Sequence, residues 1–68
     1  MMKNRVKEFR EARNLTQKEL GERVKVSRQA INAIETGKYD PSIWLAYHLA
    51  QYFGLAIEEV FQFEEEKK

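Results

Sequence analysis

A guanidinium, two carboxamides and a methyl group stand close together between residues 28 and 33. Arg28 can donate two hydrogen bonds to O6 and N7 of guanine, and Gln29 and Asn32 can pair in the same bidentate way with N6 and N7 of adenine. The methyl group of Ala33 can pack against that of thymine. Each bidentate pair would supply about 1–3 kcal/mol of discrimination between bases. These side chains predict base recognition in a major groove, although an ordinary polar helix surface carries the same residue types.

Other chemistries lack the residues that they require. The sequence has no cysteine, which excludes a disulfide, a thiolate zinc site and a cysteine nucleophile. His48 is the single histidine and has no suitably spaced partner for a metal, so we expect it to be a surface residue. The sequence shows no catalytic carboxylate pair, no nucleophile with its base and no glycine-rich phosphate loop. We therefore expect no enzyme, and neither a cofactor nor a metal ion.

Two short helices must position the residues between 28 and 33. Thr16 and Glu19 form a capping-box pattern, which predicts that the first of these helices begins at residue 17. Ser27 is a second N-cap, so the next helix begins at residue 28. The small Gly21 allows the two helices to cross closely. Five apolar residues form their shared inner face: Leu20, Val24, Val26, Ile31 and Ile34.

Hydrophobic spacing predicts five helices and no strand along the whole chain, over about residues 4–13, 17–24, 28–36, 43–53 and 57–61. Gly37 and Gly54 are C-terminal stops. Pro41 ends one element before the cap Ser42 begins the next. The pattern therefore predicts an all-α fold.

The length allows one small domain. A chain of 68 residues with 43% hydrophobic residues can form a single core. We expect a domain over residues 1–63 and a charged tail over 64–68. Folding so short a chain costs on the order of 100 kcal/mol of conformational entropy, which nearly cancels the burial of its core. Tight helix packing, dimerisation, or both are therefore expected.

The net charge of +1 conceals an uneven distribution. Residues 1–12 carry a net charge of +2, residues 13–38 carry +3 and residues 39–68 carry −4. This asymmetry favours one face that meets a polyanion and another that avoids it, with a merely solvated surface as the alternative.

Targeting and membrane segments are not expected. The first residues lack the apolar region of a signal peptide, and no apolar run approaches the ~18 residues that a membrane span needs. We therefore expect a cytoplasmic protein without membrane contact.

Several stretches together resemble the Xre-type helix-turn-helix family, to which phage repressors and Cro are related. They are LTQKEL over residues 15–20, VSRQAINAIETG over 26–37, DPS over 40–42 and FGLAIEEVF over 53–61. The resemblance covers nearly the whole chain. It implies a compact five-helix, lambda-repressor-like domain that binds double-stranded operator DNA as a homodimer and regulates transcription.

The resemblance also assigns roles to individual positions. Base contacts fall on Arg28, Gln29, Asn32 and Ala33. Phosphate contacts fall on Gln17, Ser27, Gly37, Lys38, Tyr39 and Arg13, with the amide of Gly37 and the ammonium of Lys38 as contacting groups. Packing over the end of the third helix is an alternative for Tyr39, and simple solvation is one for Arg13. Arg10 and Glu35 match a structural ion pair between the first and third helices.

Three features depart from the family's pattern. Lys25 stands where the family usually has glycine, so a left-handed backbone there would cost about 1 kcal/mol. Ala56 replaces a Ser or Thr cap, so we expect the last helix to begin loosely. The helix over residues 43–53 carries a stripe typical of an interaction surface for a protein partner, formed by Trp44, Tyr47, His48 and Gln51. Completion of a small core by Tyr47 and part of Trp44 is the alternative.

Three functions fit these residues. The leading hypothesis is a sequence-specific DNA-binding regulator of transcription, acting as a repressor. An antitoxin that binds both an operator and a toxin protein would use the same domain, and a neighbouring toxin gene would distinguish it. A helix-turn-helix module used only for protein contacts would show no salt-dependent affinity for DNA.

Overall fold

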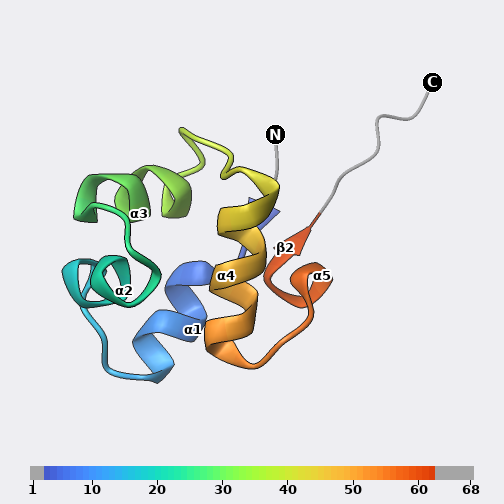
Figure 1. Ribbon diagram of the computed structural model, residues 1–68, viewed down its shortest axis with the longest axis horizontal. Helices are drawn as coiled ribbons and strands as arrows, with labels where there is room; N and C mark the ends of the chain where they lie inside the picture. Colours follow the sequence, from blue (N-terminus) through green and yellow to red (C-terminus); the bar gives the residue numbers. More distant parts are fainter. Residues whose placement is uncertain (1–2, 63–68) are drawn as a thin grey trace.

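Five helices and two very short strands make up the computed structural model, which describes residues 3–62 (Figure 1). In chain order they are β1 (Lys3–Asn4), α1 (Val6–Ala12), α2 (Gln17–Val24), α3 (Arg28–Glu35), α4 (Ile43–Phe53), α5 (Ile57–Val60) and β2 (Phe61–Gln62). The five predicted helices are therefore confirmed, and their ends differ from the prediction by no more than two residues. The predicted tail over residues 64–68 lies outside the described residues.

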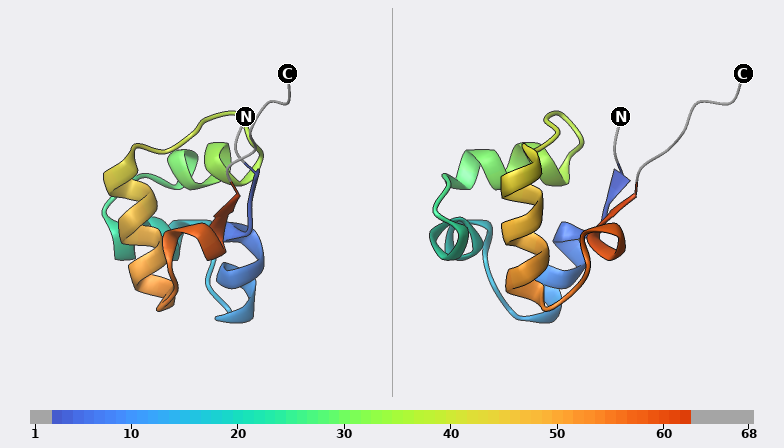
Figure 2. Two further views of the ribbon diagram at one scale, coloured as in Figure 1. Left: turned by 90° about the vertical axis from the view of Figure 1, so that its right-hand side faces the viewer. Right: turned by 45° about the vertical axis from the view of Figure 1, so that its right-hand side comes forward.

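The two strands correct the prediction that the chain has none. β1 pairs antiparallel with β2, with Lys3 opposite Gln62 and Asn4 opposite Phe61, and Figure 2 shows the two strands side by side. Phe61, predicted to end the last helix, is instead extended with φ −117°, and its side chain is fully buried. Strands of two residues escape detection in a sequence because alternation becomes visible only over about four residues.

Asn4 explains why α1 begins at Val6 and not two residues earlier. Its Oδ1 accepts a hydrogen bond from the N–H of Val6 (3.1 Å), and its Nδ2 donates to the carbonyl of Ile34 (2.9 Å). The asparagine thereby satisfies a free amide at the start of α1, as a capping side chain does. It also fastens the N-terminal segment to α3.

One hydrophobic core joins all five helices and β2. α2 packs against α3, and α4 packs against both α2 and α5. Ten buried hydrophobic residues form this core: Val6, Leu20, Ile31, Ile34, Ala46, Leu49, Ala50, Phe53, Val60 and Phe61. Two further residues predicted to face inward, Val24 and Val26, are half-buried at its edge. Within residues 3–62, no helix has both the length and the apolar character needed to cross a bilayer.

The turn between α2 and α3 determines how the two helices meet. Lys25 adopts the left-handed conformation (φ 64°, ψ 42°), and the N–H of Val26 donates to the carbonyl of Gly21 (2.9 Å). A Cβ atom on Gly21 would lie only 2.6 Å from the carbonyl oxygen of Val26. Glycine is therefore required by the close approach of the turn itself, and α3 can leave α2 at a steep angle (Figure 1).

Hydrogen bonds from side chains fix the starts of the helices to different degrees. The Oγ1 of Thr16 accepts from the N–H of Glu19 (3.0 Å), and the Glu19 carboxylate accepts from the N–H of Thr16 (2.8 Å). Ser42 caps α4 as predicted. At α5 only half of this arrangement forms, because Ala56 has no side-chain oxygen although its N–H donates to Glu59 (2.8 Å).

Candidate nucleic-acid interface

α3 separates its apolar residues from those predicted to read bases. Its two isoleucines are fully buried in the core. On the opposite face, Arg28, Gln29 and Asn32 are exposed, whereas Ala33 is half-buried. Three of the four candidate base-reading side chains are thus accessible to a ligand, and Ala33 lies at the edge of their surface.

The exposed residues of α3 share a hollow with the first residue of α2. Gln17, Arg28, Gln29 and Asn32 line it, and its volume is about 300 Å³. Two neighbouring helices therefore bring a guanidinium and three carboxamides to one continuous surface. Among residues 3–62, no acidic side chain lines this hollow.

Gln17 connects the hollow to the interior of the protein. Its Nε2 donates to Oε1 of Glu35 (3.0 Å), and its Oε1 accepts from Nδ2 of Asn32 (3.4 Å). The amide of Gln17 is therefore oriented, with its amino group toward Glu35 and its oxygen toward Asn32. One N–H of Gln17 remains available to a ligand. No sequence pattern indicates this link, because it depends on side-chain conformations across two helices.

Arg10 and Glu35, the predicted ion pair, are brought together by α1 and α3. The Nε of Arg10 donates to Oε2 of Glu35 (2.7 Å), and its Nη2 donates to Oε1 (3.2 Å). Its Nη1 donates to the carbonyl of Leu15 (2.7 Å), so the guanidinium of this buried residue is well satisfied. The hydrogen bond to Glu35 raises the pKa of Arg10 above its ordinary value. The pair joins helices and is not exposed to a ligand.

The predicted phosphate-contacting residues around α3 differ in what they can offer. Ser27 is exposed, and its Oγ accepts from the N–H of Ala30 (3.1 Å), so its own hydroxyl proton is free to donate. Gly37 has φ 77°, and its N–H already donates to the carbonyl of Ile34 (3.1 Å). The amide of Gly37 is therefore used within the chain, whereas the side chain of Lys38 is exposed.

Arg13 lies away from the hollow. Its Nη2 donates to the carbonyl of Phe53 (2.7 Å), its Nη1 donates to that of Phe9 (3.1 Å), and its guanidinium lies 4.9 Å from the centroid of the Phe53 ring. Arg13 thus follows the end of α1 and binds the last residue of α4. Figure 1 shows the ends of both helices on the side of the fold opposite α3. The structure does not bring Arg13 to the other predicted phosphate contacts.

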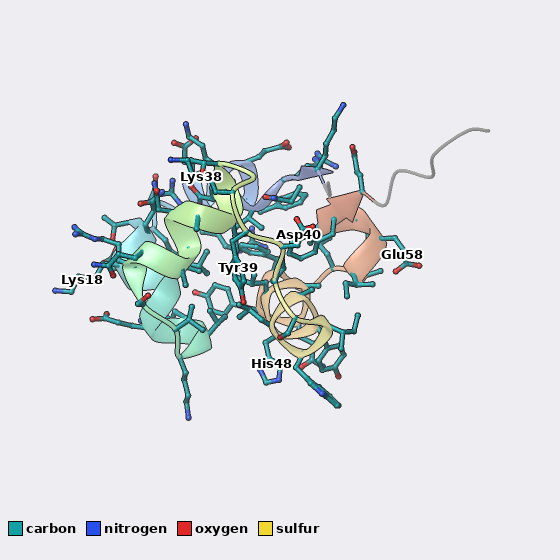
Figure 3. The ribbon with its side chains drawn as sticks, turned by 90° about the horizontal axis from the view of Figure 1, so that it is seen from above. Lys18, Lys38, Tyr39, Asp40, His48 and Glu58 are labelled. Atoms are coloured by element: carbon teal, nitrogen blue, oxygen red, sulfur yellow. The ribbon has the colours of Figure 1, made fainter. Side chains whose placement is uncertain are left out.

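Charged side chains are divided between two sides of the molecule. In Figure 3, Lys18 and Lys38 lie on the side of α2 and α3, whereas Glu58 lies beside α5 on the opposite side. Lys18 is exposed next to the first residue of α2 and was not singled out in the sequence. The sequence signal that could have identified Lys18 is its position directly after Gln17, which lines the hollow. Tyr39 is 48% exposed, so the rest of the chain covers only about half of it.

The predicted stripe on α4 is divided between two hollows. Trp44, Tyr47 and Gln51 line an apolar groove of about 460 Å³ that also contacts the connection to α5. His48 and Arg23 line a separate hollow. Gln51 is the one residue that lines both this hollow and the groove. Trp44 and Tyr47 are 71% and 45% exposed, so they do not complete a core within one copy of the chain. Nowhere in residues 3–62 do three His, Asp or Glu side chains gather to hold a metal.

Comparison with known proteins gives consistent results. The model of the helix-turn-helix family matches residues 6–60. An uncharacterized HTH-type transcriptional regulator of Methanocaldococcus jannaschii is 50% identical over 97% of this chain and 100% of its own length. A second regulator of the same description, from Bacillus subtilis, is 48% identical over 96% of this chain and 98% of its own.

A solved structure shares the fold. The crystal structure of a candidate DNA-binding protein from Bacteroides fragilis superposes with a TM-score of 0.79. It covers 91% of this chain and 100% of its own, at 22% sequence identity. At this identity the similarity concerns the arrangement of the helices alone.

Proposed function

This chain belongs to the helix-turn-helix family, and from that premise we propose that it is a sequence-specific regulator of transcription that reads the major groove of double-stranded DNA with α3. The observation that carries the proposal is the hollow in which Arg28, Gln29 and Asn32 are exposed beside Gln17. An α-helix such as α3 fits into the major groove, where each base pair presents a distinct pattern of donors and acceptors. α2 and α3 correspond to the two helices of the motif.

Each side chain of α3 has a defined part in this proposal. Arg28 donates in a bidentate way to a guanine, and the carboxamides of Gln29 and Asn32 pair with adenines. Asn32 enters the groove in an orientation favoured by Gln17, because its Nδ2 already donates to Gln17 Oε1. Ala33 supplies a minor apolar contact from the edge of the surface.

Phosphate contacts surround this face and position the protein without reading sequence. The N-terminus of α2 carries unpaired N–H groups, and Gln17 has one N–H to spare, so a phosphate is favoured there. Ser27 contributes its hydroxyl, and Lys38 contributes its ammonium, with Tyr39 as a further hydroxyl. Lys18 joins this set because it is exposed on the same side.

The regulator acts as a homodimer within this proposal, because a two-fold pair presents two α3 helices to half-sites one DNA turn apart, about 34 Å. The regulatory sense is repression, since a protein bound to an operator excludes others from the same base pairs. The site of action is the cytoplasm, where the operator is.

Selection from a pool of random duplexes, followed by footprinting at about 50 mM and about 200 mM salt, tests this function. We expect enrichment of a sequence with two-fold symmetry, protected over two half-sites, with affinity that falls steeply as salt rises. Failure to enrich any sequence, with equal affinity for all duplexes, would contradict sequence-specific regulation.

A module for protein contacts is the second candidate function, because the apolar groove on α4 lies away from α3. This candidate predicts that no duplex binds in a salt-dependent way. The same selection experiment therefore distinguishes the two functions.

A further inference from the structure

A chain of side-chain hydrogen bonds runs from the interior to the surface proposed to face DNA. It begins at the guanidinium of Arg10, which donates to both oxygens of Glu35 (2.7 and 3.2 Å). Oε1 of Glu35 also accepts from Nε2 of Gln17 (3.0 Å), and Oε1 of Gln17 accepts from Nδ2 of Asn32 (3.4 Å). Asn32 thus donates inward to Gln17, and Gln17 donates inward to the carboxylate.

The carboxylate of Glu35 sets the direction of these hydrogen bonds. Its side chain is only 3% exposed and is paired with Arg10, and a carboxylate can only accept. If the amide of Gln17 were turned over, its oxygen would face a buried carboxylate oxygen, and two acceptors would meet without a proton between them. Gln17 must therefore present its NH₂ group to Glu35 and its oxygen to Asn32.

The same reasoning fixes the amide of Asn32. Because Gln17 offers an oxygen, Asn32 must donate one N–H to it. Its second N–H and its Oδ1 remain, and within residues 3–62 neither of them has a partner. The exposed edge of this side chain therefore carries one donor beside one acceptor.

This edge is complementary to one purine and not to the other. In the major groove adenine offers a donor at N6 and an acceptor at N7, whereas guanine offers two acceptors, O6 and N7. Adenine can thus pair with both groups of the Asn32 edge, whereas guanine would place O6 against Oδ1. An amide that was turned over would expose both of its N–H groups and would suit guanine instead. The choice between the purines therefore depends on the direction of the inner hydrogen bonds.

We propose that Glu35 and Gln17 are positioning residues that make Asn32 select adenine and reject guanine at one base pair. They act through the orientation of the Asn32 amide, without touching that base. The inference rests on the proposed function, because it requires that α3 reads the major groove. Gln29 provides an internal comparison, since its side chain is exposed and, in the part of the chain that the structure describes, has no hydrogen bond that would fix its amide.

Gln17→Met removes the link but keeps a side chain of similar length. Affinities are measured for selected duplexes that carry adenine or guanine at the base pair of Asn32, which is the one whose preference Asn32→Ala abolishes. We expect the wild type to prefer adenine about tenfold, and Gln17→Met to bind the two duplexes within about threefold, because its Asn32 amide can turn over. Lys18→Met is the matched control, since it removes a neighbouring proposed phosphate contact and should weaken binding to both duplexes alike.

Glu35→Gln should reverse the chain of hydrogen bonds. The oxygen of the new amide must accept from Arg10, which can only donate, so its NH₂ group turns toward Gln17. Gln17 then accepts from position 35 and donates to Asn32, whose two N–H groups face outward. We expect this variant to prefer guanine, an inversion that a general loss of packing would not produce. Circular dichroism at low temperature verifies that the variant is folded, and Gln17→Met tests the inference with the ion pair intact.

The outcomes separate the inference from the proposed function. Adenine preference of wild-type strength in Gln17→Met, or in folded Glu35→Gln, would overturn the inference and leave the regulator function in place. An equal loss of preference at the base pair of Gln29, identified by Gln29→Ala, would also overturn it, because it would indicate a general loosening of α3. A wild type that prefers guanine at the base pair of Asn32, or whose preferences Asn32→Ala leaves unchanged, would overturn it as well. A wild type that selects no duplex would overturn the proposed function itself, and the inference with it.

Discussion

Glu35 serves two partners with one carboxylate. It binds Arg10 of α1 through both oxygens, and its Oε1 also accepts from Gln17 of α2. Gln17 in turn accepts from Asn32, which lies on the outer face of α3. A buried ion pair is thus linked through one amide to a residue proposed to read a base. Substitution of Glu35 should therefore affect both stability and the orientation of Asn32.

Glu35→Gln leaves the Arg10 guanidinium buried beside a neutral side chain. We expect a loss of about 3 kcal/mol in the free energy of unfolding, at the lower end of the range for broken buried pairs because Arg10 keeps its hydrogen bond to Leu15. Urea denaturation measures this loss. Glu8→Gln, which breaks the exposed pair with Arg5, is the control and should leave the midpoint unchanged. Equal shifts in the two variants would contradict a structural role for Glu35.

Arg28→Ala should weaken binding to the selected duplex by about 1–3 kcal/mol and relax the preference at one base pair. Lys38→Ala should instead weaken binding to all duplexes alike and reduce the slope of log K against log salt by about one. Titrations of both variants with selected and random duplexes measure these effects. If Arg28→Ala lost the same affinity on both duplexes, base reading by Arg28 would be wrong.

At the residue scale, the sequence predicted interactions between residues that are close in the chain. The family resemblance predicted the distant pair of Arg10 and Glu35. The caps at Thr16 and Ser27 involve neighbours three residues apart, so their hydrogen bonds follow from the sequence. The contacts of Arg13 did not follow, because its carbonyl partner at Phe53 is distant in the chain. The link from Gln17 to Asn32 escaped for the same reason.

The elements show the same distinction between local and distant causes. Helices that carry periodic apolar residues and caps were predicted within two residues. β1 and β2 were missed because each has two residues and they come from opposite ends of the described chain. The left-handed turn at Lys25 was anticipated from the family resemblance, because the family usually has glycine at this position.

Lys25→Gly should stabilise the protein by about 0.5–1 kcal/mol. Lys25 is exposed and adopts φ 64°, where a Cβ atom is unfavourable and glycine is not. Thermal and urea unfolding measure the gain. Lys25→Ala is the matched control, because it removes the charge but keeps the Cβ atom, and should give little gain. A gain of equal size in both variants would attribute the effect to charge.

The capping box of α2 should make stability depend on pH. The N–H of Thr16 hydrogen-bonds the Glu19 carboxylate and lowers the pKa of Glu19. Its contribution is therefore complete above the ordinary glutamate pKa of about 4.3 and is lost as the pH falls through the lower, folded-state pKa.

Unfolding midpoints of the wild type and Glu19→Gln, compared between neutral and acidic pH, test this dependence. Glu19→Gln keeps an acceptor oxygen but cannot ionise, so the wild type should lose more stability than the variant does on acidification. The pKa of Glu8 is also lowered, by its hydrogen bond with Arg5, but this pair is present in both proteins and cancels in the comparison. An identical acid response in the two proteins would exclude the Glu19 carboxylate as its source.

At the scale of the whole molecule, two separate surfaces carry the account. α2 and α3 present amides, a guanidinium and nearby lysines, whereas α4 presents an uncharged apolar groove. Acidic Glu58 lies on the side away from α3, which agrees with the uneven charge seen along the sequence. The sequence places Trp44 and His48 in one stripe on α4. The structure places them in two different hollows, which the sequence could not predict.

Side-chain amide resonances give the most direct test of the central claim that α3 reads the major groove. In a titration with the selected duplex, followed by ¹⁵N-correlated NMR, the NH₂ groups of Gln29 and Asn32 should shift strongly. The NH₂ group of Gln62, which lies in β2 and is not part of the hollow, should stay in place. Bound duplex with undisturbed Gln29 and Asn32 resonances would contradict the account.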